Sequence, residues 1–289
     1  MDVVRQELAQ DLGRAVRALR SGNRSDPRIH DIRKRLKHCR ALLRLLRKPL
    51  GDDAYQVENA RLRDAARPLM PVRDAAVLVR ALDDLCQGRD GRTFCSSIRG
   101  ALRRESRERR EQLNRKALSS SAQLVSGVAR RMRMLPPARL TRADAAQAVK
   151  RVYRSGRRAM TAAGQQRSRD GLHEWRKQVQ YLANQLESLL PLMHKGLRKI
   201  YNTSNRLAGD LGDDHDLALL HDKIIQHRKL DGGVDAEVDA LLQQLGRRRA
   251  KLQRKAYRRG KRLFAIGARR LETRLKHRLR ARHLAMRPH

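Results

Sequence analysis

The chain has few aromatic residues, few carboxylates and few cysteines. Aromatic side chains make up only 3% of its 289 residues, and 30 acidic residues stand against 68 lysines and arginines. The formal net charge is therefore +38 at pH 7. Hydrophobic residues make up 40%, which is enough for a folded core and excludes a disordered basic tail. Because so large a charge destabilises a compact chain through self-repulsion, we expect an anionic partner.

The scarcity of cysteine and of long apolar segments bears on the compartment. Cys39, Cys86 and Cys95 form no CxxC pair, which favours buried thiols in a reducing compartment over a disulfide or zinc framework. The N-terminal segment lacks the apolar stretch of a secretory signal. No run approaches the ~18 apolar residues of a membrane-spanning helix. We therefore expect a soluble cytoplasmic protein with no membrane span.

The type of basic residue indicates which polyanion is bound. Arginines number 54 and lysines 14. A guanidinium grips phosphate oxygens with a rigid fork, although a GC-rich coding sequence would also raise the arginine count. Proteins that hold single-stranded nucleic acid combine basic grooves with aromatic stacking platforms, and aromatics are scarce here. This favours a phosphate chain without bases, with nonspecific nucleic-acid binding as the alternative.

Most of the chain has helical periodicity, and no alternating strand pattern is evident. Pro136-Pro137 makes the one clear mid-chain break, and Thr141 with Asp144 forms a capping box that opens a second helical series. In the first series, the pattern predicts helices over residues 3–20, 27–48, 53–67, 71–87 and 93–134.

The second series repeats the first. Residues 29–46 align with residues 172–189, which pairs His30 with His173, and Asp74 pairs with Asp216 at almost the same spacing. We therefore predict an all-α fold of two duplicated four-helix bundles related by pseudo-two-fold symmetry. The predicted units are an N-terminal bundle over residues 1–135, a C-terminal bundle over 139–262 and a basic tail over 263–289.

The aligned segments each carry a cationic face opposite an apolar one. On a solvated helix, cations normally alternate with carboxylates at i+4, and the first segment lacks them on this face. In the second segment Gln180 and Glu187 replace two of the cations, so we expect the first half to hold more ligand charge. The candidate ligand-binding residues of the two faces are His30, Arg33, Lys34, Lys37, Arg40, Arg44, His173, Arg176 and Lys177.

Further cations could extend this surface, although each could instead pair with a carboxylate or face water. We expect them to flank the two histidine helices. These additional candidates are Arg14, Arg17, Arg157, Lys199 and Arg206.

The motifs themselves resemble a known family. HxxRKxxK from His30, PVRDAAVL, LHEWRK and LGDDHDLALL occur in order and are similar to the CHAD family, the conserved histidine α-helical domain. The resemblance implies paired four-helix bundles around a basic groove or pore that binds inorganic polyphosphate, and some members associate with polyphosphate granules. Members fused to a CYTH domain carry an ExExK signature, which is absent here.

The acidic motif allows a catalytic alternative. Asp213, Asp214, His215 and Asp216 are types that bind hard cations in metal phosphohydrolases. The aligned segment of the first half keeps only Asp74, which favours a structural role for Asp74 and Asp216: capping a helix start, complementing its dipole or orienting an arginine. No Ser/His/Asp or Cys/His arrangement or glycine-rich phosphate loop is evident. We therefore expect a non-catalytic protein without metal or cofactor, with a metal-dependent phosphohydrolase as a second alternative.

The two aligned histidines suggest a proton-linked interaction. Neighbouring cations disfavour the protonation of His30 and His173, and a bound polyanion would reverse that field. We therefore expect ligand binding to take up protons at these residues. An interior histidine bonded to a backbone carbonyl is the alternative.

The C-terminal tail has two possible states. Leu271, Leu275 and Leu279 recur at i+4 and would allow a helix against the body of the protein. Otherwise the tail is a mobile basic arm. The pattern alone leaves both open.

Overall fold

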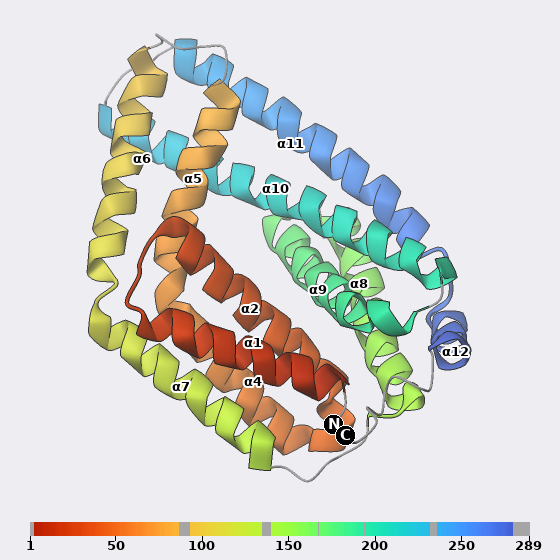
Figure 1. Cartoon of the computed structure of the whole chain (residues 1–289). Coiled ribbons are helices and arrows are strands. Elements are labelled where there is room, and N and C mark those ends of the chain that lie inside the picture. The colour runs from red at the N-terminus through yellow and green to blue at the C-terminus, as the bar shows by residue number, and fades with distance from the viewer. Residues whose placement is uncertain are drawn as a thin grey trace.

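The computed structural model describes residues 3–86, 93–134, 140–166, 168–193, 195–231 and 236–279. Within these ranges the protein is all-α, and a single isolated bridge joins the backbones of Met193 and Leu279. None of the described helices combines the length and apolarity needed to cross a membrane. The elements, of which Figure 1 labels all but α3, η1 and η2, are α1 (Val3–Arg20), α2 (Asp26–Leu45), α3 (Arg47–Leu50), α4 (Asp52–Ala66), η1 (Arg67–Leu69), α5 (Met70–Cys86), α6 (Thr93–Gln112), α7 (Arg115–Met134), α8 (Arg142–Gln166), α9 (Arg169–Leu189), η2 (Leu190–Leu192), α10 (Lys195–Asp231), α11 (Ala236–Leu263) and α12 (Ala268–Arg278).

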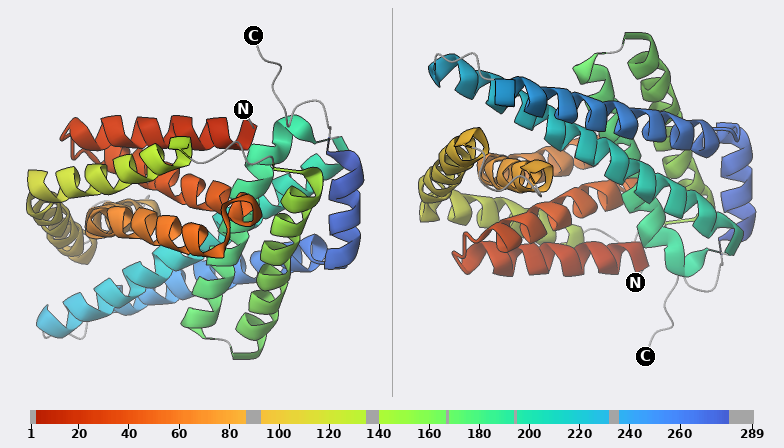
Figure 2. Two further views of the ribbon diagram at one scale, coloured as in Figure 1. Left: turned by 90° about the horizontal axis from the view of Figure 1, so that it is seen from below. Right: turned by 90° about the horizontal axis from the view of Figure 1, so that it is seen from above.

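The helices share two cores. Helices α1, α2, α4 and α7 pack together, and α8 packs against α9 and α12. One continuous core runs through both groups and includes Leu36 and Trp175. The α5–α6 hairpin instead packs against the far ends of α10 and α11, around Leu82, Leu220 and Leu241. Figure 2 shows the α10–α11 hairpin running along one side of the molecule.

The sequence explains why α2 and α9 form and how they are oriented. In α2, Pro27 occupies the first turn, and in α9 the Ser168 hydroxyl accepts a hydrogen bond from the Gly171 amide at 3.0 Å. The apolar face of each helix is fully buried, as Leu36 and Trp175 illustrate. The opposite, cationic faces are therefore left free of the core.

The expected helix over residues 93–134 is wrong in one respect, because it is two helices. The chain breaks at Leu113-Asn114, where the Asn114 side chain accepts a hydrogen bond from the Ala117 amide at 2.8 Å. An asparagine in this position satisfies an otherwise free amide of the new helix. The break allows α6 to pack on α5 while α7 packs on α1 and α4.

The start of the second series is as predicted. The Asp144 amide donates to the Thr141 hydroxyl at 3.1 Å, and the Thr141 amide donates to the Asp144 carboxylate at 3.3 Å. This is the reciprocal capping box. The break at Pro136-Pro137 and the predicted limits at 135 and 139 lie outside the described residues.

The tail takes the first of its two predicted states as far as residue 279. Helix α12 packs against α8 and buries Leu271 and Leu275, and Leu279, directly after the helix, is buried and bridges to Met193. Residues 280–289 lie outside the described part of the chain. The three cysteines are buried and free, as expected.

A buried polar chain joins α1, α2 and α9. His38 Nδ1 lies 2.6 Å from Asp11 Oδ2, and its Nε2 lies 2.8 Å from the Ser188 hydroxyl. Burial lowers the pKa of His38, but the hydrogen bond to Asp11 and the charges of Glu7 and Asp11 outweigh burial and raise the pKa above its usual range. His38 therefore connects elements that are 150 residues apart in the chain.

The close approach of α11 to α8 and α9 requires a glycine. A Cβ on Gly260 would lie 2.6 Å from Met160 Sδ and 2.7 Å from Trp175 Cζ2. We predict that Gly260→Ala lowers the free energy of unfolding by about 1–3 kcal/mol through overpacking, measured by urea denaturation followed by circular dichroism.

Gly246 is the matched control in the same helix, because a Cβ there would meet no atom of the described residues within 4 Å. Gly246→Ala should stabilise the protein by about 0.5–1 kcal/mol, since glycine weakens a helix interior. Equal effects of the two substitutions would contradict the packing described for Gly260.

Candidate functional site

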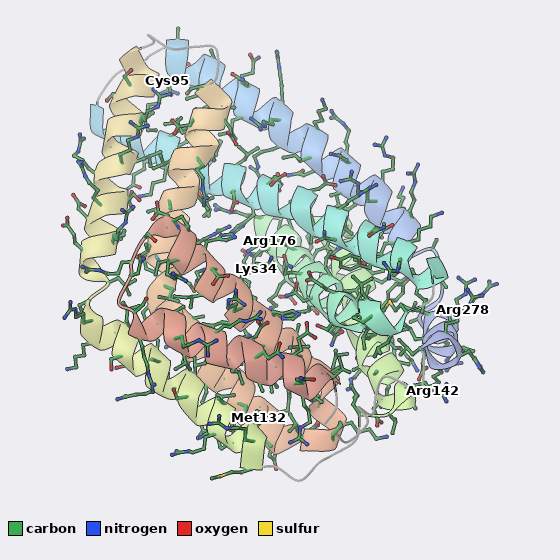
Figure 3. The ribbon with its side chains drawn as sticks, viewed as in Figure 1. Lys34, Cys95, Met132, Arg142, Arg176 and Arg278 are labelled. Carbon is green, nitrogen blue, oxygen red and sulfur yellow. The ribbon has the colours of Figure 1, made fainter. Side chains whose placement is uncertain are left out.

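The cationic faces of α2 and α9 meet in the middle of the molecule. The two helices are in contact, and Figure 3 shows Lys34 and Arg176 between them. Arg33 and Lys37 of α2 and Arg176 of α9 are half-buried, and α5 adds Arg73. These four side chains influence one another electrostatically. We call Arg33, Lys37, Arg73 and Arg176 the central cluster.

Two carboxylates hold the central cluster in place. Arg73 donates from Nη1 to Asp74 Oδ1 at 3.1 Å, and its Nη2 lies 3.3 Å from Asp216 Oδ1 on α10. Asp74 and Asp216 also attract Arg176. These two carboxylates face four cations, so the cluster keeps a positive charge.

The central cluster also contains unsatisfied hydrogen-bond donors. Within the part of the chain that the structure describes, neither Arg33 Nε nor Arg176 Nε has a hydrogen-bond partner, although both atoms are buried. Arg33 Nη1 reaches only the Ala66 carbonyl oxygen, at 3.5 Å. A buried donor without a partner costs about 1–3 kcal/mol, which an acceptor-rich ligand would recover.

The crowding of like charges appears in the pKa values. Burial, together with Arg33, Arg176 and Arg73, lowers the pKa of Lys37 to about 8. Burial and the charge of Arg176 lower the pKa of His215 to about 3, so its imidazole is neutral at physiological pH. The site therefore favours any ligand that brings negative charge.

The two aligned histidines lie at the edge of the central cluster. Burial and neighbouring cations lower the pKa of His30, for which Arg80 is the largest charged contributor, and the pKa of His173, for which it is Arg176. The His173 ring centroid lies 5.1 Å from that of His215 on α10. Two further cations of the predicted faces lie close by: Lys34 influences His30, and Lys177 forms an ion pair with Glu174.

The far end of the α2 face is ordered by an aromatic ring. Arg44 Cζ lies 3.6 Å from the ring centroid of Tyr181 on α9, and Arg40 Cζ lies 6.0 Å from it. Arg40 also donates from Nε to Asn59 Oδ1 at 3.0 Å. Both guanidiniums are therefore positioned by neutral groups, and they keep their charge for a ligand.

Arg14 and Arg17 do not join this surface. They line a separate hollow of about 300 Å³ beside Arg28, Asp31 and Arg35. Those α2 residues lie more than a quarter turn from His30 around the helix, because each residue advances the helix by about 100°. Arg14 and Arg17 therefore flank helix α2, as expected, but on another side than its His30 face, and their part in ligand binding stays a prediction.

The other additional candidates are not shown to reach the central cluster either. Arg157 on α8 and Lys199 and Arg206 on α10 are exposed. No contact given for the described residues joins their side chains to the cluster. Their part in binding stays a prediction.

The acidic motif is spread over different contacts. Asp214 is buried and accepts hydrogen bonds from Arg249 and Gln253 of α11, at 3.1 and 3.0 Å, whereas Asp216 faces Arg73. Asp216 lies deep inside α10 and not at a helix start, so of the three structural roles only the orienting of an arginine fits it. Among the described residues, no group of three or more His, Cys, Asp and Glu side chains is placed to hold a metal ion.

Two features escaped sequence reasoning. Arg73, next to Asp74, was not among the candidate cations, and His215 was considered as a possible metal ligand but not as a neighbour of His173. The expectation that no Ser/His/Asp arrangement exists is also wrong in geometry, because Asp11, His38 and Ser188 form one. The Ser188 hydroxyl is buried and also contacts the Asn184 carbonyl oxygen at 3.2 Å, so the arrangement connects helices.

Comparisons with known proteins agree with this architecture. The family model of the CHAD domain matches residues 4–224. The crystal structure of the CHAD domain from the plant Ricinus communis is similar, with a TM-score of 0.67 and 14% sequence identity over 93% of this chain and 95% of that chain. Comparison with curated proteins gives no match. Because the family model covers most of its length, the chain belongs to the CHAD domain family.

Proposed function

We propose that this protein binds long-chain inorganic polyphosphate across the facing surfaces of α2 and α9, without catalysing a reaction. The observation that carries the proposal is the central cluster, in which four cations share two carboxylates and two buried Nε donors lack partners among the described residues. A linear polyphosphate supplies closely spaced acceptor oxygens and negative charge along its whole length. Family membership supports the same ligand.

We also propose that the framework of this site is a duplication. At the offset that pairs His30 with His173, α1 corresponds to α8, α2 to α9, and the starts of α6 and α7 to positions 236 and 258 of α11. Contacts of α2 with α9 and of α5 with α10 lie where a pseudo-two-fold axis between two four-helix units would pass. Such an axis would bring the two histidine faces together.

Nucleic acid is the weaker candidate ligand, because the site offers little for bases. Of the rings near the α2 face, Tyr181 is buried and already covered by Arg44, and Tyr55 is also buried. Phosphate contacts without stacking give only sequence-independent affinity. The biological consequence we propose is recruitment to polyphosphate granules in the cytoplasm.

Neutralising the central cluster should weaken polyphosphate binding. Each charge-assisted hydrogen bond contributes roughly 1.5–3 kcal/mol, so we predict that Lys37→Gln with Arg176→Gln lowers the affinity by about 100-fold or more. Fluorescence anisotropy with labelled polyphosphate at fixed salt measures the change.

The control removes one lysine and one arginine elsewhere. Lys116 and Arg107 are exposed on α7 and α6, so Lys116→Gln with Arg107→Gln changes the net charge equally. The affinity of this variant for polyphosphate should fall by less than about threefold, because only the long-range attraction is reduced. Equal losses in both variants would mean that total charge, and not this site, binds the ligand.

Binding should take up protons. In the free protein Lys37 has a pKa of about 8, and the pKa values of His30 and His173 are lowered from 6.5. A bound polyanion raises all three pKa values, so Lys37 takes up protons at pH values around and above its pKa of about 8, and the two histidines do so at more acidic pH, around their usual pKa of 6.5. Isothermal titration calorimetry in buffers of different ionisation enthalpy measures this uptake.

Substitutions separate the two sources of protons. Lys37→Met should abolish the uptake at pH 8.5 and preserve it at pH 6.5, and His30→Ala with His173→Ala should do the reverse. Uptake that is unchanged in both variants would place the titrating groups elsewhere.

Competition distinguishes polyphosphate from nucleic acid. At equal phosphate concentration, unlabelled polyphosphate should displace a bound single-stranded RNA, whereas the RNA should displace polyphosphate poorly, because the site lacks stacking surfaces. The reverse order of displacement would favour a nucleic-acid-binding protein.

A further inference from the structure

A second basic site lies at the far end of the α2 face. A hollow of about 360 Å³ is bordered by α2, α3 and α4 on one side and by α8 and α9 on the other. Five arginines line it, and its other lining residues are neutral. We call it the arginine hollow, and its arginines are Arg44, Arg47, Arg151, Arg154 and Arg158.

Two of these guanidiniums are held in place from the α2 side. Arg44 stacks on Tyr181 and donates to the Arg40 carbonyl oxygen at 2.9 Å. Arg47 binds Asp52 through two hydrogen bonds of 2.8 and 2.9 Å and lies 5.1 Å from the ring centroid of Tyr55. Asp52 does not line the hollow, although Arg151 helps to lower its pKa. Pre-ordered guanidiniums lose little entropy when an anion binds.

The other three arginines lie on α8, spaced three and four residues apart, so that they share one face of the helix. Like charges at this spacing destabilise a helix. No hydrogen bond or ion pair given for the described residues involves the Arg154 or Arg158 side chain, and the single acidic residue of α8, Asp144, pairs with Lys48. The positive charge of this face is therefore available to bind an anionic ligand.

The arginine hollow continues the central cluster. Arg33 and Arg44 are eleven residues apart on α2, so they share a face and lie about 16 Å apart along the helix. Arg40 lies between them, and Tyr181 orders both Arg40 and Arg44. A cationic path therefore leads from the first site to the second.

We propose that the arginine hollow is a second phosphate-binding subsite, which holds the far part of a polyphosphate chain whose near part lies on the central cluster. The proposal rests on the proposed function and adds chain-length selectivity to it. A chain long enough to reach both subsites binds through both, and its second contact is intramolecular at a high effective concentration. Tripolyphosphate is too short to span them and gains no second, intramolecular contact.

The test compares tripolyphosphate with polyphosphates of increasing defined length, by isothermal titration calorimetry at fixed salt. The variant is Arg151→Gln, Arg154→Gln and Arg158→Gln, and the control is Arg104→Gln, Arg107→Gln and Arg115→Gln, an equal charge change at exposed positions on α6 and α7. Circular dichroism melting verifies that both variants stay folded.

For the wild type, we expect the affinity to rise sharply once the polyphosphate chain is long enough to span both subsites. The α8 variant should lose that rise, with roughly tenfold or more weaker binding of long chains, and keep its tripolyphosphate affinity. The control should keep both. The second subsite would be overturned if the α8 variant bound long chains as tightly as the wild type. It would also be overturned if the variant lost affinity for tripolyphosphate and for long chains to the same extent.

The central-cluster variant separates this failure from failure of the proposed function. If Lys37→Gln with Arg176→Gln still weakens binding of all lengths while the α8 variant keeps the wild-type affinity for long chains, only the second subsite is wrong. If the wild type binds no polyphosphate of any length, both proposals are wrong.

Discussion

The structure depends on holding two cationic helices side by side against their repulsion. The apolar faces of α2 and α9 are fully buried, with Leu36 on one helix and Trp175 on the other. Burying one large apolar side chain contributes about 1.5–3 kcal/mol, and each helix buries several. The core thereby forces Arg33 and Arg176 toward each other. Charge is concentrated at the centre because hydrophobic packing places it there.

The few carboxylates of the chain contribute to this concentration by being used elsewhere. Buried Glu58 binds Arg61 and Arg131, and buried Asp210 binds Lys255 and Arg259. Buried Asp11, Asp144 and Asp214 likewise connect one helix to another. Among the described residues, only Asp74 and Asp216 face the central cluster. Acidic residues thus tie the helices together, and the surplus of arginine remains where α2 meets α9.

Sequence periodicity predicted the features that depend on single helices. The separation of apolar from cationic residues predicted the buried faces of α2 and α9, and the Thr141–Asp144 pair predicted the start of α8. Features that depend on how one helix packs against another were not predicted from the sequence. Arg14 is exposed on α1 like many other cations, and only the packing of α1 on α2 shows that it lines a hollow together with Arg35. The arginine hollow needs Arg47 and Arg151, which are distant in the sequence and meet only in three dimensions.

The link through His38 has a consequence for how the chain can have evolved. Under the proposed duplication, the offset that pairs His30 with His173 also pairs His38 with Tyr181, Leu45 with Ser188 and Asp11 with Arg154. Two copies of the N-terminal half placed about the axis would set His38 against Leu45, with no hydroxyl to bond. They would also have Asp11 in place of an arginine of the hollow. If the duplication holds, each half now supplies what the other lacks, so neither half alone could rebuild this link in a symmetric pair.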